Sequence, residues 1–188
     1  MNRVIVVLAV LVVNSASALS LSRRGVAKVV AGASAGALAN AANAAVAPCP
    51  SGSNNCFSTA STDKSAVKPW TWPAGTSAAD ARKELKAVVD AYPLEGQDKV
   101  DLGGWSYVED KLVSDGSAKL EYRSGLGNMA KFFNGGKPFV DDVEIVVADS
   151  VAVRSSSRVG DSDLGVNAKR LNYLAAKLRE KGWSAPAI

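Results

Sequence analysis

The stretch that decides the fold covers residues 151–170 and reads VAVRSSSRVGDSDLGVNAKR. Valine alternates with alanine and arginine from Val151 to Arg154, which is the period-two pattern of a strand with one buried face. Residues 160–163 form a predicted turn, and apolar side chains then recur at helical spacing. The stretch is therefore a strand, a turn and a helix, with more polar side chains at the connection than a turn requires.

The segments before this unit add a helix and three strands. Ser77 is a typical helix N-cap, and Pro93 ends the helix that follows it. Strands are predicted over residues 99–109, 118–124 and 139–147, joined by hairpin signals rather than by crossovers. The order α-β-β-β-β-α predicts an α+β fold: a two-layer sandwich with an antiparallel four-stranded sheet, one helix before it and one after it, both on one face.

The last two strands form a hairpin whose pairing follows from its turn. With the turn centred at Asp149, Glu144 falls opposite Arg154, and Asp142 falls opposite Ser156. Opposite charges that face each other across two strands stabilise the pair. The polar face of this hairpin is therefore predicted to carry cross-strand ion pairs.

The charge distribution argues against a polyanionic partner. The chain has 22 basic and 18 acidic residues, and residues 1–47 hold four of the basic residues and no acidic one. The remainder is neutral, so we expect no nucleic-acid partner. The chain has no histidine, which excludes histidine-based nucleophile activation and histidine-ligated metals. We expect no cofactor and no metal site, and a non-enzyme in preference to an enzyme that uses carboxylates, Lys, Tyr or Cys.

The first 18 residues have the features of a secretory signal peptide. A short basic start at Arg3 precedes an apolar run over residues 4–13, and Ala-Ser-Ala at residues 16–18 is a cleavage pattern. The apolar run is too short for a membrane span, which needs about 20 residues.

Residues 19–47 carry a second targeting pattern. Arg23 and Arg24 precede an apolar stretch rich in alanine and glycine, and Ala-Val-Ala at residues 45–47 is another cleavage pattern. The pair of signals resembles the leader of lumenal preproteins in algae with complex plastids, and the second signal resembles a twin-arginine translocation signal. We expect the thylakoid lumen; the alternative is one signal peptide followed by an alanine-rich linker.

Residues 48–76 are predicted to form an extended arm before an α+β domain over residues 77–188. The arm contains Cys49 and Cys56, the only two cysteines of the chain. Their spacing fits neither a CxxC redox pair nor a zinc site, so a small disulfide loop is expected in an oxidising compartment, the alternative being two free thiols. Two prolines bar regular structure in the arm, and its two tryptophans either pin it to the body or form a ligand platform.

A set of polar residues around the last hairpin and helix is the candidate site. Four interpretations remain open: a structural ion-pair network, an anion site formed by the arginines, a Ca²⁺ site that includes Asp161, and carboxylate acid/base catalysis by two aspartates. We expect Arg158 to be partly buried against an aspartate and Arg170 to lie on an exposed first helical turn. The set comprises Asp141, Asp142, Arg154, Ser155, Ser157, Arg158, Asp163, Asn167 and Arg170.

Three motifs together resemble a known family. They are the Cys-Pro pair at residues 49–50, FVDDVE at residues 139–144, and VRSSSRVGDSDLGVN at residues 153–167 with Arg170 following. They resemble the domain-of-unknown-function family 1499 over essentially the whole chain after the leader. The loop between Cys49 and Cys56 is longer than is typical of that family. The resemblance implies a fold and a lineage in bacteria, algae and plants, and it implies no activity.

These observations lead to two functional hypotheses. The first is a non-enzymatic thylakoid-lumen accessory protein that docks on a photosynthetic membrane complex or assists its assembly, with contacts through exposed aromatic segments (Trp70 and Trp72; Met129, Phe132 and Phe133). The alternative is a soluble lumenal protein, or an enzyme, that binds a small anionic molecule or lipid headgroup through the arginines. Neither hypothesis requires a transmembrane segment in the processed chain.

The two-signal leader makes a direct prediction. The protein isolated from its source should begin close to Pro48, as determined by mass spectrometry of its N-terminal peptide. A mature N-terminus at Leu19 would contradict the second signal.

Overall fold

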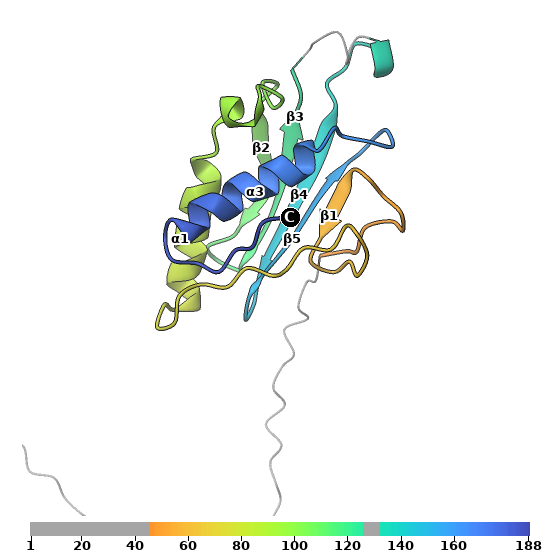
Figure 1. Ribbon diagram of the computed structural model, residues 1–188. Helices are drawn as coiled ribbons and strands as arrows, with labels where there is room; N and C mark the ends of the chain where they lie inside the picture. The colour runs from red at the N-terminus through yellow and green to blue at the C-terminus, as the bar shows by residue number, and fades with distance from the viewer. Residues whose placement is uncertain (1–45, 126–131) are drawn as a thin grey trace, which may run out of the picture. The chain divides into compact units, whose positions relative to one another are not determined.

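The fold is a five-stranded antiparallel sheet with two α-helices on one face, in a computed structural model that describes residues 46–125 and 132–188. In Figure 1, α3 crosses the face of the sheet and α1 lies beside it. Within the described residues the elements are β1 (Cys56–Ser58), α1 (Ala78–Asp90), the 3₁₀ helix η1 (Leu94–Gln97), β2 (Trp105–Lys111), β3 (Ser117–Arg123), β4 (Val140–Val147), β5 (Val151–Ser157) and α3 (Val166–Arg179).

The prediction of an antiparallel α+β fold is confirmed, but the number of strands was wrong. The sheet has the order β1-β5-β4-β3-β2, and β1 belongs to the arm that was expected to hold no regular element. Cys56, Phe57 and Ser58 pair with Ser156, Ser155 and Arg154 of β5. Without β1 the edge of β5 would leave its backbone hydrogen-bonding groups unpaired. Three residues are too few to show a sequence period.

The predicted strand over residues 99–109 begins later in the structure. The chain turns before Trp105, and Gly103 donates its N–H to the carbonyl of Arg123 at 3.1 Å. A Cβ atom at Gly103 would stand 2.3 Å from the carbonyl oxygen of Ser124, so only glycine fits this close approach. Within β2 a bulge lies between Tyr107 and Glu109.

The hairpin register is confirmed. Glu144 pairs with Arg154, and Asp142 pairs with Ser156, as the turn geometry predicts. Because side chains alternate along a strand, Val143 and Ile145 face the helices and are buried there. The next positions point to the opposite face of the sheet, which therefore carries the charged side chains.

Both predicted helices form, and the first lies between Ser77 and Pro93 as expected. Ser77 accepts a hydrogen bond from the backbone N–H of Asp80 at 3.1 Å, and α1 ends before Pro93. The apolar positions of α3 are buried against the sheet at Leu171, Leu174, Ala175 and Leu178. In the part of the chain described here, neither helix has both the length and the apolar character that crossing a membrane requires.

The arm is fastened to the domain at several points. Cys49 and Cys56 form the expected disulfide, with their Cα atoms 5.7 Å apart. Trp70 is buried and exchanges two backbone hydrogen bonds with Val151, at 2.8 and 3.0 Å. Trp72 packs edge-on against Trp183. Of the two roles considered for these tryptophans, the structure supports pinning the arm.

The described domain contains its own core. The buried cluster draws its residues from positions 67–185, in α1, the three strands β3, β4 and β5, α3, the arm and the segment after α3. Residues 1–45 of the predicted targeting segments, which extend to residue 47, and Met129 lie outside the described residues. The part of the chain from residue 46 onward therefore holds the packing that a folded unit needs.

Candidate functional site

Arg170 lies at the centre of the polar set. Its side chain is 0% exposed, so the prediction that it lies on an exposed turn was wrong. The reason is the helical period: Asn167 and Arg170 continue the stripe formed by Leu171 and Leu174 toward the start of α3. The stripe that packs on the sheet is apolar at its C-terminal part and polar at its N-terminal part.

Every N–H donor of the Arg170 guanidinium has an acceptor. Nη2 donates to Asp101 at 2.7 Å and to Asp141 at 2.9 Å, and Nε donates to Asp101 at 3.4 Å. Nη1 donates to Asn167 at 3.0 Å and to Ser155 at 3.4 Å. Since arginine has five N–H donors, none is left for a ligand.

We call Arg170, Asp101, Asp141 and the side chains that contact them the hub. It has one cation and two carboxylates, and each carboxylate accepts a hydrogen bond from a hydroxyl group. Tyr92 donates its hydroxyl to Asp101 at 2.6 Å. Ser157 donates its hydroxyl to Asp141 at 2.5 Å. These donors stabilise negative charge that the single guanidinium does not balance.

Aromatic rings close the hub on the side of α1. The Cζ atom of Arg170 lies 4.3 Å from the centre of the Tyr122 ring, which is a cation–π contact. The rings of Tyr92 and Tyr122 meet edge-on at 5.2 Å between their centres. With these rings against it, the Arg170 side chain is 0% exposed and that of Asp101 is 2% exposed.

The pKa shifts in the hub follow from its burial and its charges. Burial by itself would lower the pKa of Arg170, but the attraction of Asp101 and Asp141 is larger and raises it above the usual range. Burial, assisted by the hydrogen bond to Asp101, raises the pKa of Tyr92. Both groups therefore keep their protons at any physiological pH.

The disulfide loop supports the hub from the β1 side. The carbonyl of Asn55 accepts the backbone N–H of Ser157 at 3.0 Å and the side-chain amide of Asn167 at 3.2 Å. The same amide group donates to the hydroxyl of Ser157 at 2.9 Å. The loop closed by Cys49 and Cys56 thus holds two hub residues in position.

Arg158 lies on the face of the sheet that points away from the helices. It contacts an aspartate as expected, but it is exposed. Its side chain is 46% exposed and forms a two-pronged pair with Asp142, at 2.8 and 2.7 Å, and an ion pair with Glu121. The hydrogen bonds to Asp142 and then to Glu121 raise the pKa of its guanidinium above the usual range. Arg154 pairs with Glu144 on this face at 3.4 Å. The cross-strand ion pairs are present, and they are the exposed part of the set.

The structure divides the candidate residues between two faces. Arg170 lies inside, whereas Arg154 and Arg158 lie on the face away from the helices. The three guanidinium groups therefore do not meet at one anion site. The ion pairs and hydrogen bonds described above correspond to the structural network among the four interpretations.

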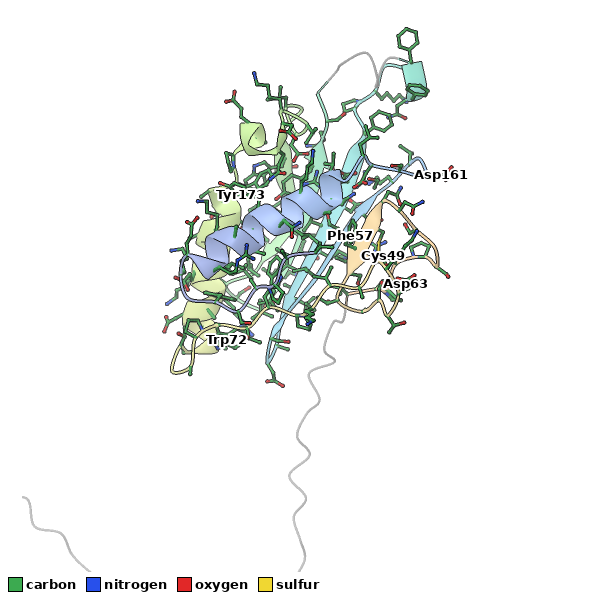
Figure 2. The ribbon with its side chains drawn as sticks, in the orientation of Figure 1. Cys49, Phe57, Asp63, Trp72, Asp161 and Tyr173 are labelled. Carbon is green, nitrogen blue, oxygen red and sulfur yellow. A yellow bond between two sulfur atoms is a disulfide. The ribbon has the colours of Figure 1, made fainter. Side chains whose placement is uncertain are left out.

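Asp163 caps α3 and does not join the other carboxylates. It accepts the backbone N–H of Gly165 at 2.9 Å and that of Asn167 at 2.7 Å. Asp161 lies at the outer tip of its loop (Figure 2) and is exposed. Among residues 46–125 and 132–188, no group of three acidic or cysteine side chains is placed to hold a metal ion.

The end of the sheet near the hub also carries exposed apolar side chains. Strand pairing of Trp105 with Tyr122, Tyr122 with Asp141, and Asp141 with Ser157 places the adjoining loops at the same end. These loops hold five of the large apolar residues that are exposed in the described part of the chain. We call them the apolar loop end: Leu102 (49% exposed), Phe132 (80%), Phe133 (73%), Val159 (45%) and Leu164 (73%).

Leu164 is exposed because of the way α3 is capped. It has φ = 54°, in the left-handed region that non-glycine residues seldom adopt. The two hydrogen bonds that the Asp163 carboxylate accepts, from the backbone N–H groups of Gly165 and Asn167, hold the chain in this turn. A strained backbone that presents an apolar side chain to solvent is a feature of interaction sites.

The family model described as "Protein of unknown function (DUF1499)" matches residues 45–178. The chain belongs to the DUF1499 family. The match covers the disulfide loop, the hub and the apolar loop end of this DUF1499 protein. No curated protein and no solved structure matches the chain.

Sequence reasoning missed three residues of the DUF1499 hub. Asp101 stands in a glycine-rich turn within a segment expected to be a strand, and 69 residues separate it from Arg170. Tyr92 continues the apolar stripe of α1, and Tyr122 alternates with polar residues along β3, so the local pattern gives both only a place in the core. A buried arginine one turn into a helix requires a carboxylate partner, but no local pattern identifies which one.

The burial of Arg170 and the exposure of Arg158 predict that their loss affects the stability of this DUF1499 protein to different extents. Arg170→Ala leaves two carboxylates in a buried hub without their cation, which should lower the free energy of unfolding by about 3–5 kcal/mol. Arg158→Ala removes an exposed pair and should cost at most about 1 kcal/mol. Urea unfolding of both variants beside wild type measures the difference; equal losses would contradict a buried hub.

Two tyrosines provide a second, matched comparison. Tyr92→Phe removes a hydrogen bond to a buried carboxylate and should cost about 1.5–3 kcal/mol. The Tyr122 hydroxyl is buried and has no hydrogen-bond partner among the described residues, so Tyr122→Phe should leave stability unchanged or raise it. Urea unfolding of both variants measures the difference. A lower urea midpoint for Tyr122→Phe than for Tyr92→Phe would refute this account of the hub.

Proposed function

We propose that this DUF1499 protein is a non-enzymatic accessory protein of the plastid thylakoid lumen. In this proposal it docks on a photosynthetic membrane complex, such as a photosystem, or assists its assembly. Its targeting would use the secretory and twin-arginine signals of residues 1–47, as in algae with complex plastids. The apolar loop end is the observation that carries the docking proposal.

The apolar loop end is suited to docking because folding leaves it uncovered. Phe132, Phe133 and Leu164 are each more than 70% exposed, and aromatic residues supply much of the binding energy at protein interfaces. They come from two different loops at one end of the sheet. Clustering of this kind distinguishes a contact surface from apolar residues that are scattered singly.

Docking has more support than binding of an anion by the arginines. The donors of Arg170 are all taken inside the hub. Arg158 already holds two carboxylates on the outer face. An anionic ligand would have to displace these partners, whereas a docking partner would meet an uncovered surface.

Native gel electrophoresis of mildly solubilised thylakoid membranes tests the proposal. We expect a fraction of the protein to migrate with a photosynthetic complex, and Leu164→Asn to reduce that fraction, because asparagine tolerates the left-handed backbone but lacks the apolar side chain. Val113→Thr is the matched control, since Val113 is 43% exposed in the turn between β2 and β3, at the other end of the sheet.

Two results would count against docking on a complex. The first is migration of the wild-type protein only as a free monomer. The second is a monomer that gains thermal stability on addition of an anionic metabolite, which would favour the small-molecule alternative.

A further inference from the structure

We propose that Phe132 and Phe133 insert into the lipid–water interface of a membrane that carries anionic lipid. This inference rests on the proposed function, because it names lipid as a partner of the apolar loop end. Lipid contact at this tip would hold the protein at the membrane surface while the remaining loops face a protein complex.

The two phenylalanines are presented on a fixed base. The backbone N–H of Ser124 donates to the carbonyl of Phe139 at 2.9 Å, and the N–H of Phe139 donates to the Ser124 hydroxyl at 3.0 Å. The Asn134 amide donates to the carbonyls of Lys137 and Pro138, at 3.1 and 2.9 Å. The described part of this loop projects beyond the end of the sheet in Figure 1, so the tip is held away from the core.

The arrangement of the pair favours a fluid surface over a rigid one. Phe132 and Phe133 are consecutive residues of a helical turn, so their side chains point about 100° apart. Both are nevertheless exposed, at 80% and 73%. A flat protein surface would cover one ring and leave the other at its margin. Lipid surrounds a protruding tip and covers both.

The charges of the segment fit an anionic bilayer surface. Residues 124–140 contain two lysines and no acidic residue, and Lys137 is exposed. Aromatic rings in the interface with lysine ammonium groups at headgroup level are the arrangement that amphipathic membrane-surface segments use. Two aromatic rings beside the exposed Lys137 predict weak, reversible binding, as for a single lipid anchor.

Vesicle sedimentation tests this inference with the folded unit, residues 46–188, which contains its own core and lacks the leader that would itself bind lipid. We expect binding to phosphatidylcholine vesicles with about one-third phosphatidylglycerol and weaker binding to pure phosphatidylcholine. Phe132→Ala/Phe133→Ala should lower the partition coefficient at least tenfold. The control Val108→Ala/Val113→Ala, which removes exposed apolar atoms elsewhere, should change it less than twofold.

A second variant tests the contact without removing it. Phe133→Trp adds an emitting group at the tip, and brominated lipid should quench its added fluorescence relative to wild type. This measurement stays decisive if the double alanine variant fails to fold.

Four outcomes would overturn the inference. They are no binding to either vesicle type, equal binding by wild type and the double alanine variant, no added quenching in Phe133→Trp, and self-association in solution that the alanine pair abolishes. Co-migration with a native complex without any vesicle binding would make the partner a protein. In that case the lipid inference fails and the proposed function stands. If the protein binds vesicles but does not migrate with a complex, the lipid inference stands and docking on a complex fails.

Discussion

The structure depends on the constraint that the buried charge of Arg170 must be fully paired. Removing a guanidinium from water costs several kcal/mol, and only close carboxylates with good geometry offset that cost. The pairing requires three separate parts of the chain: the turn that holds Asp101, the start of β4 with Asp141, and the first turns of α3. The hub therefore fixes the position of α3 on the sheet. Apolar contacts alone are less directional and would fix that position less precisely.

The alternation of a β-strand explains how one short motif supplies two different networks. Asp141 and Asp142 are neighbours in β4, and their side chains point to opposite faces. Asp141 enters the hub, whereas Asp142 joins the exposed ion pairs around Arg158. The same alternation in β5 sends Ser155 inward and Arg154 outward. The polar residues that lie close together in the sequence thus form two groups on opposite faces of the sheet: the buried hub and the ion pairs of the outer face.

This division bears on function, because the arginines of the DUF1499 motifs already have carboxylate partners within the chain. Five of the eight large apolar side chains that are exposed in the described structure gather at the loop end near the hub. The cap of α3 joins the two regions: Asp163 holds the helix whose first turns carry Asn167 and Arg170, and the same turn exposes Leu164. Stability of the hub and presentation of the contact surface are therefore coupled through one loop.

The sequence by itself determined the antiparallel α+β class, the two helices and the register of the β4–β5 hairpin, and it favoured the disulfide over two free thiols. Each of these follows from spacing or turn chemistry within a short stretch. Only the tertiary structure decided that β1 completes the sheet, that Arg170 is buried and Arg158 exposed, and that Asp101 is the partner. These depend on contacts between segments far apart in the chain. Local periodicity reports which side of an element is buried, but it does not report what lies against that side.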